Sequence, residues 1–63
     1  MTIGQKITSL RVQAGLSQED LAEKLSVSRQ SVSKWEMDQA LPQIDKVVAI
    51  CSLFGISADE LLV

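Results

Sequence analysis

Four polar side chains share one face of a short predicted helix, and their chemistry suits the edges of nucleic-acid bases. They are Arg29, Gln30, Ser33 and Lys34. Arginine and lysine can pair with guanine O6 and N7, glutamine with adenine N6 and N7, and serine with a base or a phosphate. The face has two cations and no carboxylate, so it predicts contacts to DNA. A solvated helix face without any ligand fits this composition equally well.

Two short helices joined by a tight turn must position these residues. Ser17 and Ser28 are suited to cap the amino ends of helices over residues 18–25 and 29–36. Apolar residues at helical spacing are expected to form the buried sides: Leu21, Ala22, Leu25, Val32 and Trp35. Only three residues separate the helices, and we expect Val27 among them to fill the corner. This arrangement is typical of a helix-turn-helix.

The stretch Gly15–Glu36, with Leu10 and Arg11 before it and Pro42 after it, resembles the Cro/phage-repressor (Xre-like) helix-turn-helix family. Its sequence is GLSQEDLAEKLSVSRQSVSKWE. The most specific parts are Gly-Leu-Ser-Gln before the first helix, Val-Ser at the turn and Ser-Lys-Trp-Glu at the end of the second. The resemblance covers nearly the whole chain. It implies a lambda-repressor-like domain that binds double-stranded DNA with its third helix in the major groove.

The resemblance also implies roles for single residues. Gln18 resembles the phosphate-binding glutamine of the family, and Arg11 resembles one half of an ion pair whose other half is Glu36. Such a pair would explain a cation beside an apolar stripe. The residues expected to contact DNA are Gln18, Ser28, Arg29, Gln30, Ser31, Ser33 and Lys34.

The charge of the chain is the main argument against a nucleic-acid partner. The formal net charge is −2, whereas DNA-binding domains are usually basic. The sequence also departs from the family after the second helix, where Met37 and Asp38 replace an Arg, Lys or Asn followed by Gly. We expect Asp38 to accept the left-handed conformation. The loop 37–41 has no cation to hold a DNA backbone, so we expect modest, strongly salt-dependent affinity.

The flanking segments predict three more helices and an all-α, compact five-helix bundle. An apolar stripe of Ile3, Ile7, Leu10 and Ala14 predicts a helix over residues 3–14, capped by Thr2 and ended by a left-handed Gly15. Pro42 suits the first turn of a fourth helix that Gly55 ends.

The fourth helix is the most apolar segment, and we expect it to be central to the core. Its apolar residues fall within one broad arc: Ile44, Val47, Val48, Ile50, Cys51 and Phe54. Ala49 and Leu53 fall on the other side. Ser57 and Glu60 predict a capping box for a short fifth helix through residue 62.

Apolar residues near the end of the chain exceed what a small core requires. The candidates for a subunit contact are Leu53, Leu61, Leu62 and Val63. Packing of the last three residues on the chain's own core fits the sequence equally well.

Composition limits the remaining possibilities. Sixty-three residues with 46% hydrophobic content predict one domain, residues 1–63, either alone or as the DNA-binding part of a longer regulator. The chain has no histidine and one cysteine, Cys51, so we expect no metal site, no cofactor and no internal disulfide. It has no long apolar run and no signal-peptide pattern, and a cytoplasmic location is expected.

The sequence therefore predicts a transcriptional regulator that binds a two-fold double-stranded DNA operator as a homodimer. An enzyme is not expected, because the sequence has no Gly-rich phosphate loop and no nucleophile beside a base. The alternative is an antitoxin-like or other protein-interaction module of the same fold. The acidic balance and the uncharged loop 37–41 favour that alternative slightly.

Overall fold

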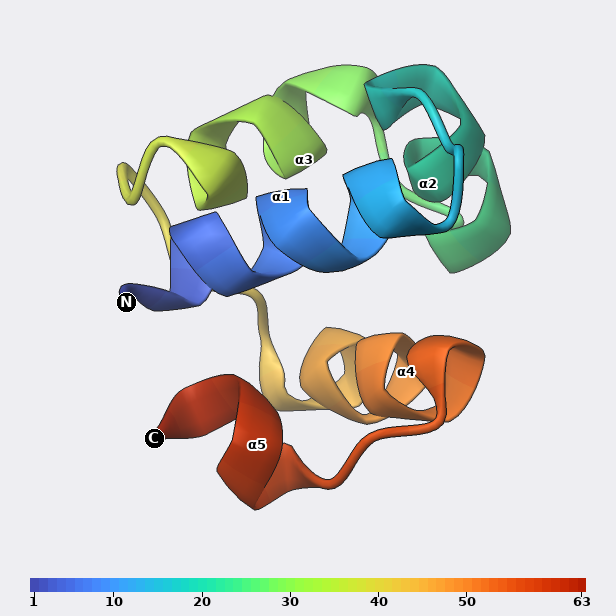
Figure 1. Cartoon of the computed structure of the whole chain (residues 1–63). Coiled ribbons are helices and arrows are strands. Elements are labelled where there is room, and N and C mark those ends of the chain that lie inside the picture. The colour runs from blue at the N-terminus through green and yellow to red at the C-terminus, as the bar shows by residue number, and fades with distance from the viewer.

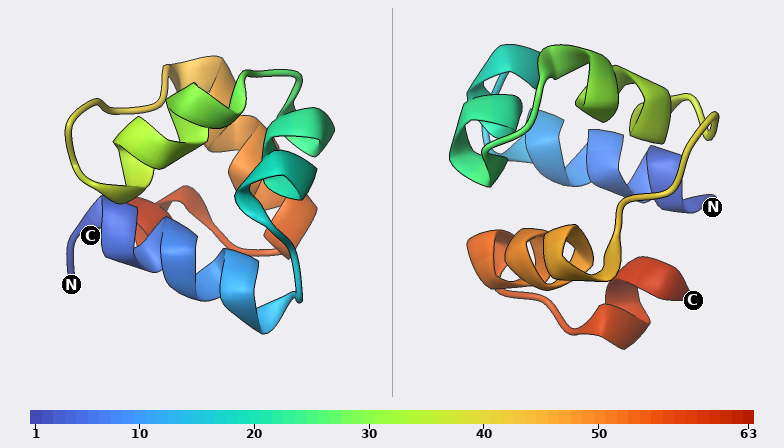
Figure 2. Two further views of the ribbon diagram at one scale, coloured as in Figure 1. Left: turned by 90° about the horizontal axis from the view of Figure 1, so that it is seen from above. Right: turned by 180° about the vertical axis from the view of Figure 1, so that it is seen from behind.

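The computed structural model describes all 63 residues, which form five helices in two layers. The helices are α1 (Ile3–Gln13), α2 (Gln18–Leu25), α3 (Arg29–Glu36), α4 (Ile44–Phe54) and α5 (Ala58–Leu62). In Figure 1, α1 lies beside α3 in the upper layer with α2 at one end, and α4 and α5 form the lower layer. The link from α3 to α4 joins the layers at the end where both termini lie (Figure 2). The predicted all-α, five-helix fold is confirmed.

Local capping determines where four of the helices begin. The hydroxyls of Thr2, Ser17, Ser28 and Ser57 each accept a hydrogen bond from a backbone N–H in the first turn of the helix that follows. Three of these sites are full capping boxes, in which a side-chain oxygen of Gln5, Asp20 or Glu60 also accepts a hydrogen bond from the backbone N–H of the cap residue. Ser57 and Glu60 thus form the predicted box.

No helix in this fold combines the length and the apolar character that a membrane span requires.

Two predicted helix ends are wrong by one or two residues. Helix α1 ends at Gln13 because Ala14 is already its cap, and Ala14 is exposed rather than part of the apolar stripe. Gly15 then takes the left-handed conformation, as expected. Helix α4 begins at Ile44 with Gln43 as N-cap, whereas Pro42 lies outside it. Pro42 is buried in the link between the layers, and the extended backbone of Gln43 separates it from the helix.

One core draws apolar residues from all five helices. Its buried members are Ile7, Leu21, Ala22, Leu25, Val32, Trp35, Val47, Ile50 and Leu61. Val27 fills the corner between α2 and α3 as predicted, and Cys51, a free thiol, is half-buried against the same cluster. Leu61 is only 1% exposed, so its assignment as a subunit-contact candidate is wrong. Leu61 belongs to the core, where α5 packs against α1 and α4.

The buried side of α4 differs from the predicted arc. Val47 and Ile50 are buried as expected, but Ile44 is 75% exposed and Val48 is 62% exposed. Ala49, expected on the outer side, packs against the core. Helix α4 contacts α2 and α5, which cover only one side of it, so the buried strip is narrower than the apolar sequence suggests.

Candidate nucleic-acid interface

The polar face of α3 points away from the rest of the molecule. Val32 and Trp35 are buried on its inner side and hold the helix against the core. On its outer side, Arg29, Gln30 and Lys34 are exposed and Ser33 is half-buried. We call these four residues the outer face of α3. Seen from above in Figure 2, no other element lies over α3, so the outer face is open to a large ligand.

Two serines lie at the amino end of α3. The Ser28 hydroxyl accepts from the Ser31 N–H at 3.1 Å, and the two hydroxyl oxygens are 3.1 Å apart. Ser28 is exposed and Ser31 is half-buried. Both therefore border the outer face while they stabilise the start of the helix.

Arg11 and Glu36 form a largely buried ion pair that joins α1 to the end of α3. Arg11 Nε donates to Glu36 Oε2 at 2.7 Å, and a second guanidinium nitrogen donates to Oε1 at 3.1 Å. The side chains are only 15% and 6% exposed. Arg11 also donates to the Leu16 carbonyl at 2.9 Å, which satisfies a third donor. The two residues that the family resemblance pairs are thus in direct contact.

Gln18 connects this ion pair to the outer face of α3. Its Nε2 donates to Glu36 Oε1 at 3.0 Å, and its Oε1 accepts from Arg29 at 3.3 Å. Burial alone would raise the pKa of Glu36, but hydrogen bonds from Arg11 and Gln18 and the Arg11 charge outweigh burial. The pKa of Glu36 therefore lies below its ordinary value, and its carboxylate stays charged at neutral pH.

Asp38 holds the other end of α1 against α3. It takes the left-handed conformation, with φ of 57°, as the sequence predicted. Its carboxylate accepts from the Thr2 hydroxyl at 2.6 Å and from the Gly4 N–H at 2.9 Å. The charge therefore lies at the positive end of the α1 dipole, where it is stabilising. No local pattern signals this contact, because 34 residues separate Gly4 from Asp38.

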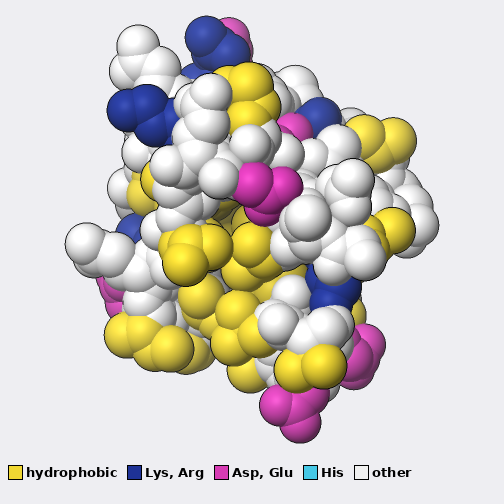
Figure 3. Space-filling view, turned by 90° about the vertical axis from the view of Figure 1, so that its left-hand side faces the viewer, with side chains coloured by type: hydrophobic (Ala, Val, Ile, Leu, Met, Phe, Trp, Pro, Cys, Tyr) yellow, Lys and Arg dark blue, Asp and Glu magenta, His cyan; other side chains and the backbone are white.

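The loop after α3 is exposed and without a cation. Met37 is 57% exposed and Leu41 is 73% exposed. Figure 3 shows hydrophobic side chains gathered over the lower half of this side of the molecule, with most lysine and arginine side chains in the upper half and one lower down at the right edge. Cationic groups for a phosphate backbone thus lie beside α3 rather than in the loop that follows it.

Three of the four subunit-contact candidates are exposed, one in α4 and two at the end of the chain. Leu53 is 40% exposed, Leu62 is 52% exposed and Val63 is 91% exposed. Lys6 donates to the Val63 carbonyl, which ties the end of the chain to α1. These three apolar side chains remain available to a partner, whereas Leu61 is not.

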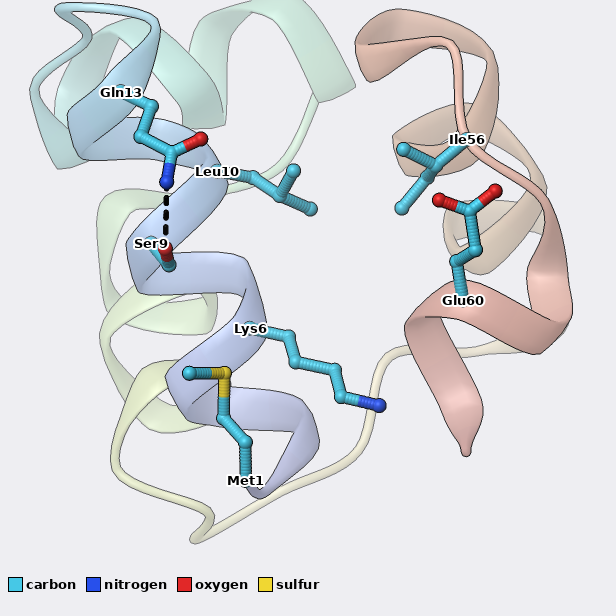
Figure 4. A pocket seen from close by; sticks show the side chains of 7 residues that line it. All are labelled: Met1, Lys6, Ser9, Leu10, Gln13, Ile56 and Glu60. Carbon is cyan, nitrogen blue, oxygen red and sulfur yellow. Dashed lines mark hydrogen bonds between the residues drawn. The ribbon is translucent and has the colours of Figure 1, made fainter.

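A shallow hollow of about 210 Å³ lies away from α3, between α1 and the segment around α5. Figure 4 shows Lys6 and Leu10 pointing from α1 toward Ile56 and Glu60 on its opposite wall. No cluster of carboxylates and thiols in the structure could hold a metal ion. The outer face of α3, with the exposed side chains of Arg29, Gln30 and Lys34, is the candidate functional site.

Two helices that meet at a three-residue turn, with the polar face of the second turned outward, define a helix-turn-helix domain. A family model described as helix-turn-helix matches residues 7–61. The chain belongs to this family, and its helix-turn-helix is of the Cro/C1 (Xre-like) type. The predicted resemblance is confirmed.

Two curated relatives share this domain within longer chains. The chain is 40% identical over 62 residues to the HTH-type transcriptional activator BcrR of Enterococcus faecalis, and this match covers 98% of the chain and 30% of the relative. It is 32% identical over 62 residues to the HTH-type transcriptional regulator ImmR of Bacillus subtilis, and covers 98% of the chain and 49% of that relative. The chain thus spans less than half the length of either relative.

Solved structures with the same fold include two proteins bound to DNA. The P22 c2 repressor in complex with a synthetic operator superposes with a TM-score of 0.92 at 26% identity, covering 98% of this chain and 94% of the other. The biofilm regulator SinR in complex with DNA superposes with a TM-score of 0.85 at 30% identity, covering 95% of this chain and 97% of the other.

Proposed function

We propose that this domain binds double-stranded DNA sequence-specifically as a transcriptional regulator, with α3 in the major groove. The observation that carries the proposal is the placement of α3: Val32 and Trp35 anchor one side, and the outer face is open to solvent. Membership of a family of DNA-binding regulators, which are not enzymes, supports it. On this proposal the protein acts in the cytoplasm, and residues 1–63 serve as one DNA-binding domain.

The proposed contacts divide into those that read bases and those that hold the backbone. Gln30 and Lys34 would contact base edges, because the exposed first turns of the inserted helix approach the groove floor. Arg29 and Ser33 lie on the same face and would reach a base or a phosphate. Phosphate contacts are assigned to three residues at the ends of the paired helices: Gln18, Ser28 and Ser31.

We further propose that two copies bind a two-fold operator. The chain has six cations in all, so one domain can neutralise few phosphates. Two copies of α3 about 34 Å apart would meet successive major grooves on one side of the duplex. We assign the contacts between the copies to the exposed apolar residues Leu53 at the end of α4 and Leu62 and Val63 at the end of the chain.

Selection of duplexes from a random pool by the purified domain tests the proposal. The expected result is an enriched palindromic motif whose affinity falls steeply as salt rises. Lys34→Ala should weaken binding to that motif, whereas Lys24→Ala, which makes the same change of charge on α2, should have a smaller effect. A pool without any enriched sequence at low salt would contradict the proposal.

The rival function is a protein-interaction module of the same fold. The net charge of −2 and the exposed Met37 and Leu41 in a loop without a cation favour it. Absence of any selected duplex, together with a specific protein retained on the immobilised domain, would support this function instead.

A further inference from the structure

A single chain of contacts runs from the interior of the domain to the outer face of α3. Arg11 holds Glu36, Glu36 accepts from Gln18, and Gln18 accepts from Arg29. The side chain of Glu36 is 6% exposed, and Arg29 is exposed. Among these contacts, Gln18 is therefore the only residue that connects the buried Glu36 carboxylate to the exposed Arg29 on the outer face of α3.

The charges on either side of Gln18 allow one orientation of its amide. A reversed amide would set Oε1 against the Glu36 carboxylate and Nε2 against the Arg29 guanidinium. Both contacts would then be repulsive. Because Arg11 keeps Glu36 charged, the carboxylate is a permanent acceptor for Nε2, and the amide oxygen is directed toward Arg29.

This orientation leaves one donor unused. A primary amide has two N–H groups, and Glu36 takes one of them. The same Gln18 amide thus has one free N–H and an oxygen that accepts a hydrogen bond from the Arg29 guanidinium. Phosphate oxygens accept hydrogen bonds from amide N–H groups and from guanidinium groups. In addition, Arg29 loses less rotamer freedom on binding if Gln18 has already restrained it.

We propose that Glu36 is a positioning residue for DNA contact: its carboxylate orients Gln18, which in turn holds Arg29 and presents a free N–H to the DNA backbone. This inference rests on the proposed function and deepens it. It gives Glu36 a second role besides its ion pair, one that acts through Gln18 rather than through a direct contact with DNA. It also assigns Gln18 and Arg29 to one contact rather than two independent ones.

The first test uses the free protein. The side-chain amide of Gln18 and the carboxyl carbon of Glu36 are followed by NMR during an acid titration of the isotope-labelled chain. The Gln18 amide signals should move with the midpoint of the Glu36 carboxyl. The amide of Gln13, which donates a hydrogen bond to Ser9 and makes none to this network, is the internal control. Gln18 signals that ignore the ionisation of Glu36 would overturn the proposed orientation.

The second test is a double-mutant cycle on a selected duplex with Gln18→Met and Arg29→Met. Methionine keeps the length of Gln18 and leaves the Arg11–Glu36 pair in place. The combined loss of affinity should be smaller than the product of the single losses by at least about threefold, because the two residues act as a unit. The matched control Gln13→Met should bind as the wild type does. Losses that multiply independently would overturn the shared contact.

The two tests separate this inference from the proposed function. A wild-type domain that binds no duplex would overturn the proposed function and the DNA part of the inference with it. The titration of the free protein still decides whether Glu36 orients Gln18.

Discussion

Gly4 of α1 packs directly against the backbone carbonyl of Trp35 in α3, so the backbones of the two helices are in contact. A Cβ at Gly4 would overlap that carbonyl oxygen and would lie 2.8 Å from the carbonyl oxygen of Glu36. The Gly4 N–H also donates to Asp38. The end of α3 is thus held at close range by the first turn of α1 and, two turns later, by Arg11.

Gly4→Ala should destabilise the domain by about 1–3 kcal/mol, because backbone atoms of two helices must move apart to admit the methyl group. Urea denaturation gives the free energy of unfolding. Gln13→Ala, on the exposed side of the same helix, should change it by no more than about 0.5 kcal/mol. Equal stability of the two variants would contradict the close approach of α1 and α3.

Removal of either partner of the Arg11–Glu36 pair should cost up to about 3–5 kcal/mol, because the remaining charge is left buried and poorly compensated. The double substitution should cost less than the sum of the single ones. Asp45→Ala provides a contrast, since the Asp45 side chain is 67% exposed and its carboxylate lies 3.9 Å from the Lys46 ammonium. That change should cost below about 1 kcal/mol. Strict additivity at Arg11 and Glu36 would count against a coupled pair.

The stability contributed by Glu36 should disappear in acid. A carboxyl whose pKa is depressed by folding stabilises the folded state above its unfolded pKa, about 4.3 for glutamate, and loses this contribution as the pH falls through the folded pKa. The free-energy difference between wild type and Glu36→Gln should therefore be constant near neutrality and shrink below about pH 4.3. A difference that persists unchanged to about pH 3 would contradict a lowered pKa of Glu36.

Gln30→Ala should change which DNA sequences are preferred rather than weaken binding uniformly. A bidentate contact between glutamine and adenine contributes about 1–3 kcal/mol of discrimination against another base pair. Affinities for the selected duplex and for its single-base variants measure this effect. If the variant lost affinity equally for cognate and scrambled duplexes, Gln30 would not be a base-reading residue.

Leu53→Glu and Leu62→Glu should abolish cooperative filling of a full operator while leaving each domain folded, because both side chains are exposed. Circular dichroism checks the fold, and titration against a full operator and a half-site measures cooperativity. Leu61→Glu is unsuitable here, since it would place a charge in the core. Tight one-to-one binding to the half-site, unaffected by either change, would show that the domain acts as a monomer.

Most helix boundaries and the outer face of α3 followed from short-range patterns. Ser17, Ser28 and Ser57 each cap a helix through a residue three positions ahead, and Gly15 and Gly55 take the left-handed conformation after helices. Such signals need no knowledge of the rest of the fold, because donor and acceptor are neighbours in the chain. The same holds for the polar side of α3, whose inner residues are apolar at helical spacing.

Which apolar residues are buried was decided by the packing of the helices. Ile44 and Val48 look like core residues in the sequence, yet α2 and α5 cover the side of α4 that carries Val47 and Ile50. Leu61 is in the core because α5 folds back onto α1 and α4.

The polar contacts between distant segments were likewise beyond local patterns. Asp38 caps α1 across 34 residues, and Gln18 lies between Glu36 and Arg29. Residue types state which groups can donate, accept or be buried. Only the relative placement of the helices determines which of these groups come within hydrogen-bonding distance, because each such contact joins segments that are separated in the sequence.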